Sequence, residues 1–274
     1  MHAPDTSSPA ARRELVLVVA ILVALARLVG PPGAFAVAAL IPVVVLLAGV
    51  KVLGGDASSA RTLEPSIVPA VLAGGSAAAI HLVPVGPWII VALVAFAMLF
   101  DRAIALEQRL LHQATGTSDG DRARVLLLAV ATAFVAFTGV AALVPGGIAQ
   151  PGGTPAVAAQ PLTETALVVL ALGDALVALL LGYRISAFRY GSVAEAARSA
   201  LTYGLVIAIA AGAIRAVDLP RLVGPAVLTL VFYLWDAQHG SAPARRREPR
   251  FVWEMLLLAA LAVVVLAWNL RLRV

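Results

Sequence analysis

Nine apolar stretches dominate this chain, and each is close to the roughly 20 residues that a helix needs to cross a bilayer. Clusters of proline and glycine separate several of them, such as GPPG at 30–33 and PVGP at 84–87, and such clusters do not continue a helix. We therefore predict an all-α, polytopic integral membrane protein with about nine transmembrane helices. Eight spans and one re-entrant piece are the alternative. The predicted spans are 14–29, 34–53, 66–83, 87–108, 124–144, 162–183, 199–216, 221–239 and 252–270.

A single helical domain over residues 14–270 follows from this pattern. Residues 1–13 would form a short disordered cytoplasmic tail, and residues 271–274 a C-terminal tail. The first apolar stretch superficially resembles a signal peptide, but no convincing small-residue cleavage site follows it. We interpret it as an uncleaved first helix.

The composition excludes several function classes. Hydrophobic residues make up 61% of the chain and charged residues 13%, whereas a soluble domain has about 25% charged residues, so lipid must be the solvent. There is no cysteine, which excludes disulfides, thiolate metal sites and cysteine nucleophiles. No nucleotide-binding glycine loop, HExxH or Gly-x-Ser-x-Gly motif is present. The sequence thus names no cofactor, metal site or catalytic residue.

The basic residues predict the orientation in the membrane. If the N-terminus is cytoplasmic, 15 of the 20 Lys and Arg residues fall in cytoplasmic segments, as the positive-inside rule expects. The exceptions are Arg27, Arg215, Arg221, Arg271 and Arg273. We therefore expect an inner (cytoplasmic) membrane protein with its N-terminus inside. The same rule explains the net charge of +5 without nucleic acid.

The basic loop before the last span is a candidate contact with lipid. It contains Arg245, Arg246, Arg247 and Arg250. Arginines beside a membrane attract anionic lipid headgroups, but the same residues also simply obey the positive-inside rule. The sequence also leaves open whether the chain binds other membrane subunits.

Asp174 is the polar residue that most needs an explanation, because it lies in the middle of the apolar run 170–184. Each residue advances about 100° around a helix, so Asp174 shares one stripe with Ala171, Ala175, Ala178 and Gly182. Small residues in membrane helices mark faces that pack against other helices. Asp174 is thus predicted to point into protein. An acid at that depth is a functional-site hypothesis; the alternative is a structural bond to a neighbouring helix.

Two further residues extend this hypothesis into a transport or proton path. Glu164 lies on the same stripe, about 15 Å toward the outside. Arg215 ends a small-residue stripe on the seventh predicted span and could pair with Glu164. The third and fifth spans carry small faces as well, so we expect these four helices to pack tightly together.

A weaker candidate lies at the cytoplasmic interface, where Asp101, Asp236 and His239 end two predicted helices. Asp236 and His239 share one helical face and could hold a metal or pass a proton. Charges at helix ends are ordinary, however. His81 could ligate a pigment or haem, although a lone histidine is more often simply hydrogen-bonded.

Three functions remain open on the sequence alone. The first is a small proton-linked transporter, or a flippase for a lipid-linked substrate, that uses Asp174, Glu164 and Arg215. The second is a structural or accessory subunit of a larger membrane complex. The third is a membrane enzyme acting on lipid headgroups, which would need Asp101, Asp236 and His239 to converge.

Overall fold

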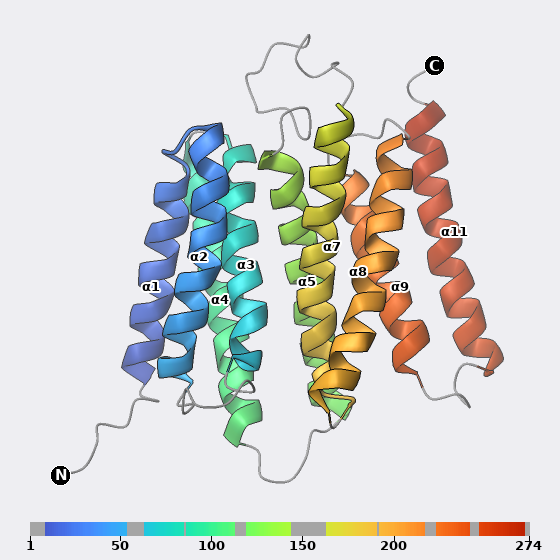
Figure 1. Cartoon of the computed structure of the whole chain (residues 1–274), viewed down its shortest axis with the longest axis horizontal. Coiled ribbons are helices and arrows are strands. Elements are labelled where there is room, and N and C mark those ends of the chain that lie inside the picture. The colour runs from blue at the N-terminus through green and yellow to red at the C-terminus, as the bar shows by residue number, and fades with distance from the viewer. Residues whose placement is uncertain are drawn as a thin grey trace.

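The computed structural model describes residues 9–53, 63–84, 86–112, 119–143, 163–190, 192–216, 223–241 and 247–271. Within these ranges the chain forms nine long α-helices, two short 3-10 helices and no strand (Figure 1). The α-helices are α1 (Pro9–Ala26), α2 (Pro31–Val52), α3 (Ile67–Ala79), α4 (Pro87–His112), α5 (Asp119–Leu143), α7 (Glu164–Ala187), α8 (Val193–Ala216), α9 (Val223–Gly240) and α11 (Pro249–Arg271). The 3-10 helices are η2 (Glu64–Ser66) and η3 (Ile80–Leu82), on either side of α3.

Each predicted span coincides with one of these helices, and local signals set where the helices begin. Four of them begin at a proline, namely Pro9, Pro31, Pro87 and Pro249, because proline lacks an N–H that the first turn would leave unbonded anyway. α7 begins after Thr163, whose hydroxyl accepts a hydrogen bond of 3.2 Å from the backbone N–H of Ala166. Because α1 begins at Pro9, residues 9–13, which we predicted to belong to a disordered tail, are helical.

The helices run alternately up and down, nearly parallel to one axis (Figure 1). α1 begins and α11 ends at opposite ends of the bundle. We call the end where α1 begins the basic end, because the helix termini there adjoin most of the arginines in the sequence. The other is the opposite end.

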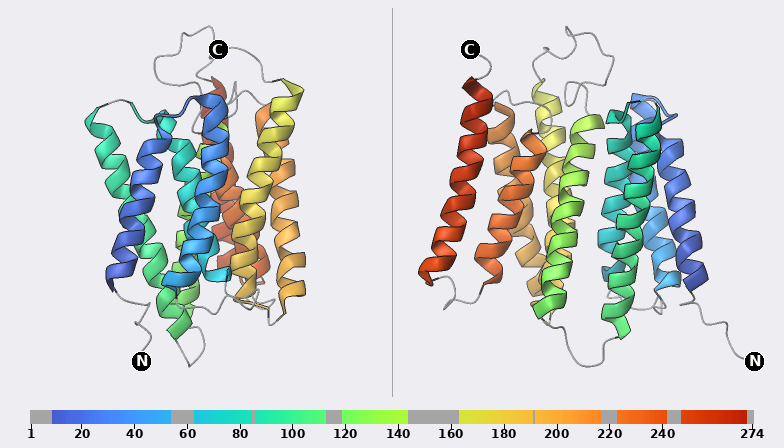
Figure 2. Two further views of the ribbon diagram at one scale, coloured as in Figure 1. Left: turned by 60° about the vertical axis from the view of Figure 1, so that its left-hand side comes forward. Right: turned by 180° about the vertical axis from the view of Figure 1, so that it is seen from behind.

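Two groups of helices are visible from both faces of the bundle (Figures 1 and 2). α1–α4 enclose one apolar core, which contains Val19, Val45, Leu72 and Phe100. α5, α7, α8 and α9 build a second core with help from α3 and α4. α3 therefore contributes to both cores and joins the two groups along its contact with α5.

Glycine and alanine make the contact between α3 and α5 very close. A methyl group on Gly75 would lie 2.6 Å from the Cα atom of Ala136, and one on Gly139 would lie 2.9 Å from the Cβ atom of Ala78. On α7 and α8, a methyl group on Gly182 would reach the ring of Tyr203. These contacts confirm the predicted tight packing of the third, fifth, sixth and seventh spans. The cause is that small residues in membrane helices allow backbones to approach closely.

The outside of the bundle is apolar, as a protein dissolved in lipid requires. Large hydrophobic side chains are exposed along several helices, including Leu47, Ile90, Leu172, Leu205 and Leu257. Among the described residues, six helical stretches are long and apolar enough to cross a membrane. They are Gly33–Val52, Glu64–Leu82, Pro87–Leu111, Gly120–Leu143, Glu164–Ala187 and Val193–Ile214. α1, α9 and α11 are not among them; α1, for example, carries Arg12, Arg13 and Glu14 near its start.

Candidate functional site

A buried ion pair joins the two groups of helices near the basic end. Glu107, in the last turns of α4, is 1% exposed, and Arg184, near the end of α7, is 6% exposed. The Nε atom of Arg184 donates to one carboxylate oxygen of Glu107 at 3.0 Å, and its Nη2 atom donates to the other. The guanidinium group also lies 4.1 Å from the centroid of the Phe188 ring. This bidentate geometry is among the strongest that a charged pair can form.

A second bond joins the same end of α7 to the first group. The hydroxyl group of Tyr183 donates to a carboxylate oxygen of Glu64, in η2, at 2.8 Å. Tyr183 and Arg184 are neighbours in sequence, so one turn of α7 is bonded to both η2 and α4. We call Glu64, Glu107, Tyr183 and Arg184 the bridging cluster, because its bonds link the two groups of helices.

Arg189, Tyr203 and Asp236 form a separate network within the second group. An Nη atom of Arg189 lies 2.6 Å from the Asp236 carboxylate, to which Tyr203 also donates at 2.7 Å. Arg189 further donates to the Tyr203 hydroxyl at 3.1 Å. Burial would lower the pKa of Arg189, but Asp236 and Tyr203 outweigh it and raise the pKa above its ordinary value. The network therefore ties the turn after α7 to α8 and α9.

The predicted cluster of Asp101, Asp236 and His239 does not assemble around one point. Asp101 forms an ion pair of 2.9 Å with Arg12, on α1, whereas Asp236 belongs to the network with Arg189. His239 is exposed, and its ring stacks against Trp235 with centroids 3.8 Å apart. The part of the chain that the structure describes contains no group of three or more potential metal ligands. The hypothesis of a lipid-headgroup enzyme thus has no assembled site in that part of the chain.

Asp174 points into the protein, as its small-residue stripe predicts. It is 0% exposed and lies near the middle of α7, about 15 Å along the helix axis from Arg184. The positions beside it on α7 are in close contact with other helices. A methyl group on Gly173 would lie 2.8 Å from Val140 of α5, and one on Gly204 of α8 would lie 3.2 Å from the carbonyl oxygen of Ala175. The carboxyl group is therefore enclosed between closely packed helices.

The other residues of the predicted path are farther away. Glu164 is the first residue of α7 and is exposed at the opposite end. Arg215 lies in the last turn of α8, but its side chain is outside the described residues. In the predicted lipid-binding loop, Arg245 and Arg246 are also outside them, whereas Arg247 and Arg250 are exposed. Arg250 forms an ion pair of 3.1 Å with Glu254, one turn along α11.

The bridging cluster was not predicted from the sequence, although the sequence contains one signal for it. Glu107 follows Phe96, Phe100 and Ala103 at helical spacing, and all four side chains are buried. An acid that continues an apolar stripe in this way indicates a buried partner. Nothing in the sequence identified Arg184 as that partner, because the two residues are 77 positions apart.

Comparison of the chain with family models, curated proteins and solved structures found no match. The function must therefore be inferred from the chain's own residues.

Proposed function

We propose that this protein is a proton-linked transporter of the inner (cytoplasmic) membrane in which Asp174 carries the coupled proton. The observation that carries the proposal is the complete burial of this acid at mid-height in α7. A charge at the centre of a bilayer costs at least about 2.5–3.5 kcal/mol, so such acids are rare outside pathways for ions, protons or substrates. Asp174 would take up a proton from one side and release it to the other.

The proposed transporter spans the membrane nine times, with its N-terminus in the cytoplasm. The alternating course of the nine described helices supports this topology. It is also supported by the concentration of Lys and Arg in the segments at one end of the bundle, which the positive-inside rule assigns to the cytoplasm. The basic end would then face the cytoplasm. Arg245, Arg246, Arg247 and Arg250 would meet the anionic headgroups there.

The bridging cluster would be the cytoplasmic gate of this transporter. It joins α7, which carries Asp174, to α4 and η2 of the other group of helices. Breaking the bonds of Glu107 and Glu64 to α7 would remove these polar links and let the two groups tilt apart at the basic end about the close contact between α3 and α5. Such rigid-body movement of one helix group against the other is a common route to alternating access. Glu164 and Arg215 would then belong to the external part of the path.

Thermal melting of Asp174→Asn, from about pH 5 to about pH 9, tests whether Asp174 serves folding or transport. Asparagine keeps the shape of the side chain and removes its charge. The proposal expects a variant at least as stable as the wild type that has lost a pH dependence seen in the wild type, because a group whose pKa differs between the folded and unfolded states couples stability to pH. A variant that melts far lower at every pH would instead make Asp174 a structural residue and overturn the proposal.

Because the chain lacks cysteine, single cysteines can probe access to Asp174. Ala178→Cys places a thiol one turn from Asp174, at a position that is fully buried. A membrane-impermeant maleimide applied from the cytoplasmic side should label it slowly in the wild-type background and faster with Glu107→Gln. Leu172→Cys, on the exposed side of the same helix, is the matched control and should not respond to Glu107→Gln. Equal rates in both backgrounds at Ala178→Cys would rule out the gate.

The second candidate, an accessory subunit of a larger complex, is favoured by α11. This helix lies at the edge of the bundle (Figure 1) and exposes Trp253, Leu256, Leu257 and Val263. A partner helix could cover this face in a complex. The oligomeric state after extraction in a mild detergent distinguishes the two candidates, since a transporter of this design needs no other subunit.

A further inference from the structure

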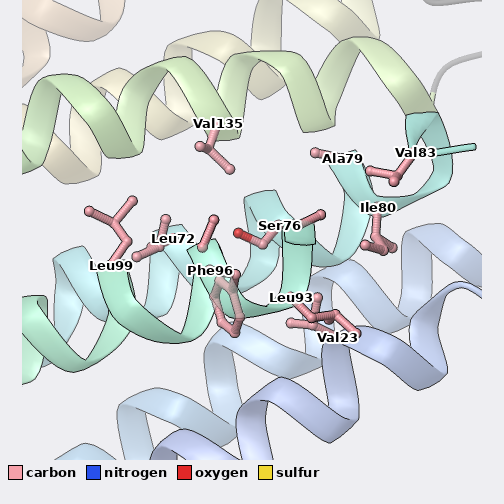
Figure 3. A pocket seen from close by; sticks show the side chains of 12 residues that line it. Val23, Leu72, Ser76, Ala79, Ile80, Val83, Leu93, Phe96, Leu99 and Val135 are labelled. Carbon is pink, nitrogen blue, oxygen red and sulfur yellow. The ribbon is translucent and has the colours of Figure 1, made fainter. Parts of the chain in front are cut away.

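An apolar cavity of about 210 Å³ lies between α1, α3, α4 and α5 (Figure 3). Its walls include Val23, Leu72, Ile80, Leu93 and Phe96, and Ser76 is the one polar residue among those that line it. The cavity is partly open to the outside of the bundle. An apolar cavity of about 150 Å³ is large enough to take up a small hydrocarbon and to stay free of water. In a membrane, the hydrocarbon at hand is a lipid acyl chain.

Two residues with nitrogen-bearing side chains lie close in the chain to residues that line the cavity, toward the opposite end of the bundle. Arg27 lies one turn beyond Val23, and His81 directly follows Ile80; both Val23 and Ile80 line the cavity. His81 is 4% exposed and lies close enough to Arg27 for their charges to interact. The Nε atom of Arg27 and the Nε2 atom of His81 are both buried without a hydrogen-bond partner among the described residues, although the imidazole also interacts with the backbone of Ala26.

Buried nitrogens of this kind are costly to leave unbonded. A donor without a partner is less stable than in its hydrated state, and more so if it is charged. A guanidinium group beside an imidazole attracts an anion and offers it hydrogen bonds. Arg27 is also one of the few basic residues in the segments at the opposite end of the bundle. The positive-inside rule does not account for an arginine there.

We propose that Arg27, His81 and the adjoining cavity form a binding site for an anionic phospholipid. The phosphate lies against Arg27 and His81, and one acyl chain enters the cavity beside Val23 and Phe96. Arg27 and His81 favour an acidic headgroup, and the apolar walls of the cavity favour a hydrocarbon chain. Together they select a molecule that is acidic at one end and hydrocarbon at the other. This site is independent of the proposed transport function and lies at the other end of the bundle from the bridging cluster.

Lipid binding to the purified, delipidated protein tests the proposal. We would add phosphatidylglycerol or phosphatidylcholine with identical acyl chains and measure the affinity by native mass spectrometry and the melting temperature in detergent. Phosphatidylglycerol should bind and stabilise more strongly. Arg27→Gln should weaken its binding about ten-fold or more, since hydrogen bonds to a charged group contribute about 1.5–3 kcal/mol. The matched control is Arg109→Gln, an exposed arginine at the basic end, which should leave the preference intact.

Two further experiments separate the contribution of the lipid headgroup from that of its acyl chain. Ala92→Leu fills the cavity from α4 and should weaken binding of long-chain phosphatidylglycerol; Ala79→Leu does the same from α3 if the first variant does not fold. Inorganic phosphate alone should not stabilise the protein. Equal binding of both lipids, equal effects of Arg27→Gln and Arg109→Gln, stabilisation by phosphate alone, or unchanged lipid binding in the filled cavity would each overturn the proposal.

Discussion

Glu107 and Asp174 are both acids inside the helical bundle, but the two regions that hold them are built differently. Near the basic end, Glu107 and Arg184 form a bidentate ion pair between α4 and α7. At mid-height, Asp174 is enclosed by helices whose glycines bring the backbones close together. The first region matches a negative charge with a positive one at short range. The second is shaped by close packing, and the transport role that we propose for its acid rests on its burial at mid-height in the bundle.

Removing one partner of the bridging cluster should have the largest effect on stability. Arg184→Gln leaves the Glu107 carboxylate buried opposite a neutral group, and breaking a buried pair in this way costs about 3–5 kcal/mol. Thermal and denaturant unfolding in detergent would measure the loss. The double variant Glu107→Gln and Arg184→Gln should recover part of it, because no unmatched charge remains. A double variant that is no more stable than Arg184→Gln would mean that the unmatched charge of Glu107 is not the cause of the loss. Charge matching would then not distinguish the region of Glu107 from that of Asp174.

Enlarging a glycine in the closely packed layer should have the next largest effect. Gly139→Ala places a methyl group against the backbone of Gly75 and the side chain of Ala78, and overpacking of this kind costs about 1–3 kcal/mol. The matched control is Gly212→Ala on α8, which has open space around it and should be neutral or stabilising by up to about 1 kcal/mol. The difference in unfolding free energy between the two variants is the quantity to measure. Similar values would show that the α3–α5 contact is looser than described.

Tyr203→Phe should have a smaller effect, because it removes one hydrogen-bonding hydroxyl and leaves the ion pair intact. Arg189 still reaches Asp236 directly at 2.6 Å, so we expect a loss of about 1 kcal/mol. Tyr190→Phe, at an exposed position, is the control and should not change the melting temperature. A loss as large as that of Arg184→Gln would mean that the Arg189 network stabilises the basic end as much as the bridging cluster does.

The half-exposed pair of Arg12 and Asp101 should contribute least. Exposed ion pairs contribute about 0.2–1 kcal/mol and are screened by salt. Arg12→Gln should therefore lower the melting temperature only slightly, and the difference should shrink further at high ionic strength. An effect that is large and independent of salt would show that the pair is shielded from water in the folded protein.

The sequence predicted the features that repeat along one helix, and it did not predict those that depend on neighbours. Helical spacing placed Asp174 and Ala178 on a buried face, and both are buried in the structure. The bonds from Arg184 to Glu107 and from Tyr183 to Glu64 cross between helices far apart in the chain. Apolar periodicity says that a helix has a packed face, but it does not say which helix covers that face. For the same reason, apolar periodicity could not predict that Asp101 and Asp236 pair with different arginines.

The contact between Gly139 and Gly75 has a consequence for how this protein can vary during evolution. Among the atoms closest to a methyl group on Gly139 is the backbone carbonyl of Gly75, and every amino acid carries that carbonyl. A mutation at position 139 therefore cannot be rescued by a compensating change of side chain at position 75. Relatives of this protein that keep the same helix contact should all retain glycine at position 139, whereas position 212 should accept many residues.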